Sequence, residues 1–225
     1  MIAKAGATNE AYFLTETDLK PRFNIHLARR LWHLAGVLTI VTVYTYASYR
    51  LSLIILGIAF ICFVIPDFLR QRNPELNQLT LRWFRLIIRQ NEAHSFSGVS
   101  YLLIGTAIIV LLFPPQVATL SLLFVAFGDP ISSIFGVMYG KDKIVGDKSL
   151  QGAFAGFLVC GLVAYIYYLV KGLMLERAFL AAMVSGVIGA VSEVFPVRKL
   201  DDNLTFPVIS SFLLYMMFHL FGAFA

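Results

Sequence analysis

Charged residues are scarce in this chain. Asp, Glu, Lys and Arg make up 14% of its 225 residues, whereas soluble domains contain about 25%. Apolar residues reach 59%, above the ~45–50% that is usual for soluble domains. This balance excludes an ordinary water-soluble domain and indicates a protein embedded in lipid.

Cysteine is also scarce, and its placement excludes two classes of small stabilised domain. Cys62 and Cys160 both lie inside apolar runs, so they provide neither a disulfide framework nor a zinc site. We interpret both as small packing side chains. The N-terminal segment over residues 1–20 is polar and lacks the apolar stretch of a signal peptide, so we expect no cleaved leader there.

Long apolar runs fill residues 21–225, which we interpret as a single transmembrane domain. A spanning helix needs about 20 mostly apolar residues. Seven runs come close to that length: Trp32–Ala47, Leu51–Phe68, Val99–Phe113, Gln116–Tyr139, Leu150–Val170, Ala178–Phe195 and Leu204–Ala225. The sequence therefore predicts an all-α, polytopic membrane bundle of about seven transmembrane helices. Because proline cannot donate a backbone hydrogen bond, we expect the fourth run to open at Gly128-Asp129-Pro130.

Lys and Arg are strongly biased to one side of the predicted membrane. Of the 18 such residues, only Arg50, Lys171 and Arg177 fall on one side, and all others fall in the N-terminal segment or in alternate loops. Cytoplasmic loops carry such an excess, so the N-terminus is predicted to be cytoplasmic. Topology thus accounts for the net charge of +5, which argues against a nucleic-acid partner.

Two basic stretches, over residues 21–34 and 76–90, have the pattern of amphipathic helices. In the second, Arg82, Arg85 and Arg89 form a polar stripe beside aromatic and aliphatic side chains. Helices of this kind lie at the membrane surface. The pattern leaves open whether they only anchor the chain to anionic lipid or also contribute to a functional site.

Asp129 is the leading candidate for chemistry. An ionisable group at membrane depth is expensive and is usually functional. The alternative is a structural aspartate that caps a half-helix.

The segment that follows, from Gly140 to Gly152, indicates polyphosphate binding. It contains three lysines (Lys141, Lys143 and Lys148) and a serine, Ser149, before the fifth apolar run. Glycines let backbone N–H groups approach an anion, a helix N-terminus adds a positive dipole end, and lysines supply point charges for phosphate. The spacing does not match a Walker loop.

Three further polar motifs flank the apolar runs. Asp201, Asp202 and Asn203 offer oxygens that suit Mg²⁺, although a helix N-cap explains them equally well. The other two motifs are Arg29-Arg30-Leu31-Trp32-His33 and the stretch from Glu92 through His94 to Gly98. Every motif falls on the side predicted to be cytoplasmic, where soluble nucleotides and Mg²⁺ are available. Together they describe a phosphoryl- or nucleotidyl-transfer site, in which catalysis is mostly positioning and charge neutralisation.

The combination of motifs resembles the polyprenol kinase family, which includes kinases of dolichol, phytol, farnesol and diacylglycerol. Its nucleotide-binding signature is similar to Gly128-Asp129, Ser132-Ser133, Gly136, Gly140, Lys148-Ser149 and Gly152. Two other family motifs are similar to Asp201–Pro207 and to the set Arg30, Trp32, His33 and Gly36. The likeness runs from about Arg29 to Ser211. Gln151 departs from it, because a glutamate is common there.

This resemblance implies a CTP-dependent, Mg²⁺-dependent kinase that transfers the γ-phosphate to the hydroxyl of a membrane lipid alcohol. It implies catalytic roles for Asp129, Asp201, Asp202, His33, Glu92 and His94, with the three aspartates also binding metal. It implies nucleotide binding by Arg29, Arg30, Ser132, Ser133, Gly136, Gly140, Lys141, Lys143, Lys148, Ser149, Gly152 and Asn203.

Two alternatives stay open at this point. Phosphatidate cytidylyltransferases share part of the signature but also carry a C-terminal motif that is absent from this sequence, which favours the kinase. A membrane transporter fits less well, because one run is clearly interrupted and no repeat is evident. The sequence does not distinguish an isoprenoid alcohol from diacylglycerol as the substrate. It also leaves open which group is the general base and whether the chain forms a homo-oligomer.

The charge bias predicts where the lysine-rich loop lies. A single cysteine introduced between Lys141 and Lys148, in a chain without its two native cysteines, should react with a membrane-impermeant thiol reagent only from the cytoplasmic side. Labelling of intact cells from outside would contradict the orientation.

Overall fold

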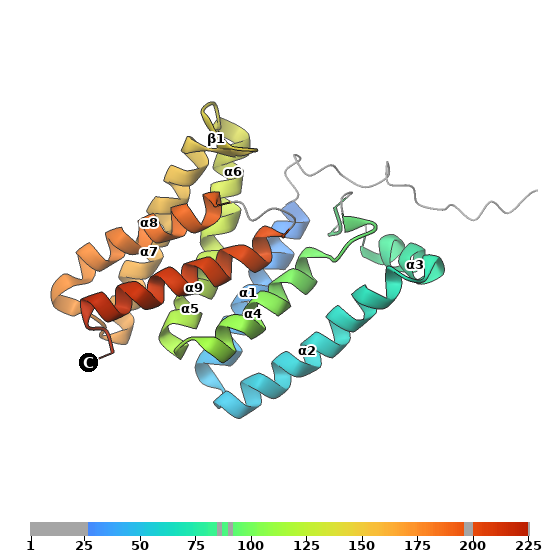
Figure 1. The fold of residues 1–225 in the computed structure, drawn as a ribbon, viewed down its shortest axis with the longest axis horizontal. Helices are drawn as coiled ribbons and strands as arrows, with labels where there is room; N and C mark the ends of the chain where they lie inside the picture. The colour runs from blue at the N-terminus through green and yellow to red at the C-terminus, as the bar shows by residue number, and fades with distance from the viewer. Residues whose placement is uncertain (1–26, 85–86, 90–91, 196–199, 225) are drawn as a thin grey trace, which may run out of the picture.

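The computed structural model describes residues 27–84, 87–89, 92–195 and 200–224, and this part of the chain is mostly helical (Figure 1). The α-helices are α1 (Leu27–Tyr46), α2 (Tyr49–Arg70), α3 (Pro74–Phe84), α4 (Gly98–Leu112), α5 (Pro115–Leu123), α6 (Asp129–Tyr139), α7 (Leu150–Lys171), α8 (Ala178–Val194) and α9 (Asp202–Phe221). A π-helical turn, η3 (Phe124–Gly128), joins α5 to α6, and a 3₁₀ turn, η4 (Leu175–Arg177), precedes α8. Two short strands, β1 (Lys143–Val145) and β2 (Lys148–Ser149), form a hairpin between α6 and α7.

Five helical segments in the described residues are long and apolar enough to cross a membrane, so the chain is a helical membrane protein. They are Tyr49–Arg70, Pro115–Tyr139, Leu150–Lys171, Leu175–Val194 and Asp202–Phe221. The first and third predicted runs are also helical, as α1 and α4. However, α4 has 15 residues, fewer than the ~20 needed to span a bilayer, and α1 carries two arginines in its first turn. The count of seven spans and the cytoplasmic N-terminus therefore stay predictions.

The helices pack as neighbours in a bundle whose outer surface is apolar. Helix α7 packs between α6 and α8, and α9 contacts both α8 and α4. Helix α2 lies at the edge of the bundle beside α4 (Figure 1). Its side chains Ile54, Ile58 and Ile61 are exposed, which suits a helix surrounded by lipid rather than by water.

The fourth predicted run is not broken at Gly128-Asp129-Pro130, so that expectation is wrong. The helix continues through the π turn, in which the backbone N–H of Asp129 donates to the carbonyl of Phe124. Pro130 lies in the first turn of α6, where a missing N–H is tolerated. Gly128 allows close packing here, because an added Cβ would lie 2.5 Å from Sγ of Cys160. A π turn inside an α-helix often marks a functional site.

The lysine-rich segment is a hairpin and not an irregular loop. Strands β1 and β2 pair antiparallel, and Gly146 lies between them with φ +56°, a conformation that glycine adopts without steric cost. Strands of three and two residues, each with a lysine, have no clear sequence signal. The hairpin is the one exception to the predicted all-α class within the described residues.

The two predicted amphipathic helices differ from the prediction in their extent. Helix α3 accounts for the start of the segment 76–90 but ends at Phe84, with Trp83 exposed. From Leu27 onwards, the segment 21–34 forms the first turns of α1 rather than a separate surface helix. The polar segment 1–20 and residues 21–26 lie outside the described residues.

Candidate active site

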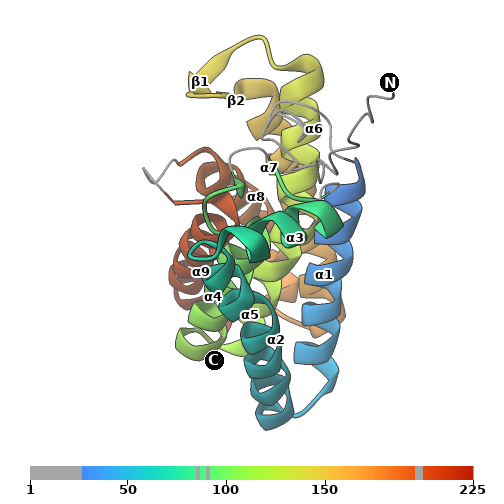
Figure 2. The ribbon, with the colours of Figure 1, turned by 90° about the vertical axis from the view of Figure 1, so that its right-hand side faces the viewer.

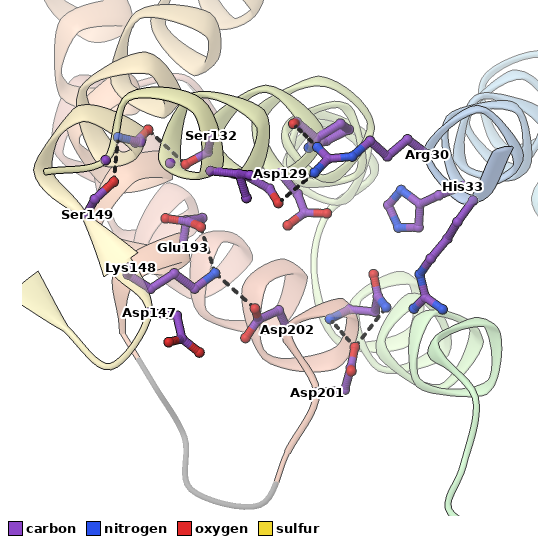
Figure 3. Close-up of a pocket in the computed structure, with 18 of the residues that line it drawn as sticks. Arg30, His33, Asp129, Ser132, Asp147, Lys148, Ser149, Glu193, Asp201 and Asp202 are labelled. Atoms are coloured by element: carbon purple, nitrogen blue, oxygen red, sulfur yellow. Dashed lines mark hydrogen bonds and ion pairs between the residues drawn. The ribbon is translucent and has the colours of Figure 1, made fainter. Parts of the chain in front are cut away.

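The hairpin lies at one end of the bundle (Figure 2). A cavity of about 420 Å³ is lined in part by this hairpin (Figure 3). Its walls come from α1, α6, the hairpin, and the ends of α7, α8 and α9. The lining residues are Arg29, Arg30, His33, Arg89, Asp129, Pro130, Ser132, Ser133, Gly136, Val137, Gly140, Lys143, Asp147, Lys148, Ser149, Gly152, Glu193, Asp201, Asp202 and Asn203. Segments that are far apart in the sequence thus bring acidic and basic side chains into one space.

Asp129, the first residue of α6, lies at the centre of the labelled side chains in Figure 3. Its carboxylate forms no hydrogen bond or ion pair with another described residue and is therefore available to a ligand. The π turn before it continues the helix up to this residue. An acid that lines the cavity and makes no hydrogen bond or ion pair of its own with the described residues is the strongest indication of function there.

Arg30 connects α1 to the first turn of α6. Its guanidinium donates to the carbonyl oxygen of Pro130 at 2.6 Å and to Oγ of Ser133 at 3.2 Å. These contacts fix the start of α6, and with it Asp129, relative to α1. Arg30 and Ser133 therefore both line the cavity as expected, and part of their hydrogen-bonding capacity is already used within the protein.

Lys148 is held between two carboxylates. Its Nζ donates to Oε1 of Glu193 at 2.6 Å and to Oδ2 of Asp202 at 2.9 Å. Burial alone would lower the pKa of the Lys148 ammonium, but the negative charges of Asp202, Glu193 and Asp129 outweigh burial and raise the pKa above its ordinary value. Lys148 is therefore a fixed positive charge at any physiological pH.

The two aspartates at the start of α9 have different roles. Asp201 is the N-cap of the helix, and its Oδ1 accepts hydrogen bonds from the backbone N–H and the side-chain amide of Asn203, at 3.0 and 2.7 Å. Burial raises the pKa of Asp201, and the N–H of Asn203 partly opposes this. Asp202 pairs with Lys148 instead. The N-cap alternative thus describes Asp201, although both side chains line the cavity.

The predicted glycines and serines build the wall between α6 and α7. A Cβ on Gly152 would lie 2.8 Å from the carbonyl oxygen of Ser132, and Oγ of Ser132 donates to the carbonyl of Gly152 at 2.8 Å. Ser149 is the N-cap of α7 and accepts from the N–H of Gly152. The N–H of Leu150 also has an acceptor, the carbonyl of Asp142. Because these N–H groups are already used, the positive charge for a phosphate must come mainly from side chains.

Three predicted site residues do not line the cavity. Lys141 is exposed, and its backbone N–H donates to Oε1 of Gln151. His94 is exposed as well. Glu92 is buried behind the cavity, where its carboxylate accepts two hydrogen bonds from the guanidinium of Arg29, at 2.7 and 2.9 Å. Glu92 therefore orients a residue of the cavity and does not reach into it.

A second buried ion pair supports Glu92 from behind. Arg70 is 2% exposed and pairs with Asp67, and its guanidinium also donates to the carbonyl oxygens of Glu92 and Ser95, at 3.0 and 2.7 Å. The other oxygen of Asp67 accepts from the N–H and hydroxyl of Ser97. This network fixes the loop that presents Glu92 to Arg29.

The structure adds three charged residues that the sequence analysis did not place in the site. Glu193 is an acid inside an apolar run, and the rule that singled out Asp129 applies to it as well. Arg89 was placed in a surface stripe but lines the cavity. Burial lowers the pKa of Arg89, and the nearby charge of Arg29 adds to this. Asp147, in the turn of the hairpin, gave no signal in the sequence.

No group of three or more His, Cys, Asp or Glu side chains forms a preformed metal centre in the part of the chain that the structure describes. This does not disfavour Mg²⁺, which commonly uses one or two carboxylates together with water and substrate phosphates. Asp129 and Asp202, which both line the cavity, match that donor set.

The chain is similar to three fungal proteins, each called CTP-dependent diacylglycerol kinase 1. It is 32% identical to the Schizosaccharomyces pombe protein over 175 residues, and this match covers 72% of this chain and 79% of the relative. The Saccharomyces cerevisiae protein is 27% identical over 210 residues, covering 82% and 71% of the two chains. The Eremothecium gossypii protein is 26% identical over 189 residues, covering 76% and 59%. No family model and no solved structure matches the chain.

The contact between Arg29 and Glu92 yields a prediction about stability. Replacing Glu92 by Gln removes the charge that pairs with a largely buried guanidinium, and breaking such a pair costs about 3–5 kcal/mol. We expect Glu92→Gln to lower the melting temperature of the detergent-solubilised protein clearly. Glu75→Gln, at an exposed glutamate of α3, is the matched control and should melt like the parent. Equal melting of both variants would show that the pair does not support the fold.

Proposed function

Because the chain belongs to the polyprenol kinase family, which includes the CTP-dependent diacylglycerol kinases, we propose that it transfers the γ-phosphate of CTP to the hydroxyl of diacylglycerol. The active site is the cavity at the hairpin end of the bundle. The names of the relatives indicate the nucleotide and the lipid class, and the charges in the cavity provide groups that could bind and position the phosphates.

The observation that carries this proposal is the combination, in one cavity, of cationic groups with a carboxylate that makes no hydrogen bond or ion pair with the described residues. Arg29, Arg89 and Lys148 line the cavity from different segments of the chain, and together they would offer positive charge to a triphosphate. Asp129 faces them without a partner among the described residues. Phosphoryl transfer needs little covalent participation by the protein, and positioned charges provide most of the catalysis.

Asp129 and Asp202 would hold Mg²⁺, which shields the charge of the phosphates. Asp201, although it caps α9, keeps Oδ2 outside the hydrogen bonds that form the cap and completes the proposed set of carboxylates. The basic side chains would orient the triphosphate. A carboxylate that binds metal is a poor proton acceptor, so we assign the uptake of the hydroxyl proton to His33.

His33 suits this role by its position. It lines the cavity from α1, and its Nε2 is buried without a hydrogen-bond partner among the described residues. In Figure 3 its imidazole ring lies between α1 and the side chain of Asp129. A general base must come within hydrogen-bond reach of the hydroxyl from which it removes the proton.

The cavity also fits the predicted topology. The fifteen Lys and Arg residues on the more basic side include every basic residue that lines it. We therefore place the active site at the cytoplasmic face, where CTP is available, with the lipid hydroxyl reaching it from the adjacent leaflet.

Isotope position distinguishes this reaction from nucleotidyl transfer. Purified protein given diacylglycerol and CTP labelled at the γ-phosphate should produce labelled lipid, whereas CTP labelled at the α-phosphate should not. Phosphatidate should not act as acceptor. Transfer of the α-label to phosphatidate would instead establish a cytidylyltransferase.

Removing single carboxylates tests their electrostatic role. Asp→Asn at position 129, 201 or 202 keeps the size of the side chain but removes a charge, and loss of one preorganised electrostatic contact costs on the order of 10²–10³ in rate. We expect losses of that size in kcat for lipid phosphorylation. Lys141→Met, at an exposed lysine outside the cavity, should retain activity within about twofold.

Protein amount and melting temperature have to be measured beside turnover, because a folding defect would imitate a catalytic one. Asn caps helices about as well as Asp, so a purely structural role at all three positions predicts near-normal turnover. If the three Asn variants fold and work within a few-fold of the parent, the carboxylate site is wrong.

A further inference from the structure

Glu193 occupies a position that neither the family resemblance nor the names of the relatives assign to any role. It lies in the last turn of α8, lines the cavity, and is 6% exposed. Its carboxylate bonds to Nζ of Lys148 at 2.6 Å, the shorter of the two ion pairs of that lysine (Figure 3). Lys148 comes from β2, 45 residues away in the sequence.

Stability alone gives a poor reason for an acid at this place. Taking a carboxylate and an ammonium out of water costs several kcal/mol each, and replacing a buried ion pair with packed apolar side chains is often neutral or stabilising. Glu193 is the only charged residue of α8. What the pair provides is a defined position for the ammonium group inside the cavity.

The two carboxylates around Lys148 are not equivalent. The side chain of Glu193 is 6% exposed, whereas that of Asp202 is 35% exposed. The buried partner is fixed by the packing of α8 against α7 and α9. The exposed partner can rearrange at lower cost, because water can replace a contact that it loses.

Within the proposed kinase function, we propose that Glu193 is a positioning residue that holds the Lys148 ammonium in place for the triphosphate of CTP. Glu193 itself does not touch the nucleotide. When the phosphates bind, they replace Asp202 as a partner of Lys148, and Glu193 keeps the ammonium oriented. Among the described residues, Lys148 is the group that forms a hydrogen bond and an ion pair with the Glu193 carboxylate, so the positioning effect of Glu193 acts through Lys148.

The direction of the kinetic change separates this role from a general electrostatic effect. Glu193→Gln removes a negative charge near the site of a polyanion, so electrostatics alone would improve the use of CTP. Loss of positioning does the opposite, because misplacing a contact by about 1 Å can reduce the rate on the order of 10²-fold. We expect Glu193→Gln to lower kcat/KM for CTP by about 10- to 100-fold, with KM for diacylglycerol unchanged.

Glu176→Gln is the matched control, since Glu176 is an exposed glutamate just before α8, at the end of that helix remote from the cavity. This variant should keep the parental kcat/KM for CTP. An unchanged or higher kcat/KM for CTP in Glu193→Gln would overturn the proposal. So would an equal loss in the control.

A double-mutant cycle tests whether Glu193 acts through Lys148. Lys148→Met should lower kcat/KM for CTP, and adding Glu193→Gln should lower it by no more than about a further twofold. The double variant should also melt at a higher temperature than Lys148→Met alone, because the single variant leaves a buried carboxylate unpaired. Multiplicative kinetic losses, or a double variant that melts lower, would show that Glu193 acts independently.

A binding measurement separates failure of this inference from failure of the proposed function. The shift in melting temperature on addition of Mg²⁺ and CTP, without lipid, reports nucleotide binding whatever the acceptor is. We expect a shift in the parent and in Glu176→Gln, and a smaller shift in Glu193→Gln. Equal shifts in all three would contradict the role of Glu193. A parent that shows the shift but phosphorylates no lipid would contradict the kinase function alone.

Discussion

The contact of one ammonium group with two carboxylates organises the polar end of this bundle. Lys148 links the hairpin to the end of α8 through Glu193 and to the start of α9 through Asp202. These elements are separated along the chain but meet where the cavity forms. If the ammonium were absent, two acids, of which Glu193 is buried, would face each other, and the cost would oppose the packing of α8 against α9. The shape of the cavity therefore depends on charge pairing as much as on apolar packing.

The same need to pair charges explains the buried ion pairs behind the cavity. Charges are costly to leave uncompensated in a helix bundle in lipid, and Arg29, Arg30 and Arg70 each have acceptors within the protein. Arg29 is bound by Glu92, and the loop of Glu92 is bound by Arg70, which pairs in turn with Asp67. Asp129 departs from this pattern, since its carboxylate lines the cavity and makes no hydrogen bond or ion pair in the described part of the chain. That contrast, more than its depth alone, marks it as the group that meets a ligand.

Local sequence signals predicted the helices well, but they predicted the contacts between distant residues only in part. The apolar run Leu51–Phe68 corresponds to α2 within two residues at each end, because hydrophobic length is a direct signal of a membrane helix. The family signature correctly brought Asp129 and Lys148 to one cavity. It misplaced Glu92 because an ion pair across 63 residues depends on how helices pack, and no local pattern encodes that. Glu193 could have been found, since the argument from intramembrane charge applied to it unchanged.

The balance of charge in the cavity bears on the form in which a nucleotide enters. Five basic and five acidic side chains line it, Arg29, Arg30, Arg89, Lys143 and Lys148 against Asp129, Asp147, Glu193, Asp201 and Asp202. A bare triphosphate would meet repulsion from the acids that offsets its attraction to the basic groups. A triphosphate that carries a divalent cation presents both signs, so the acids and the bases each find a partner. For the proposed reaction, this arrangement favours the metal–nucleotide complex over the free nucleotide, and it does so without the preformed cage of ligands that a structural metal site requires.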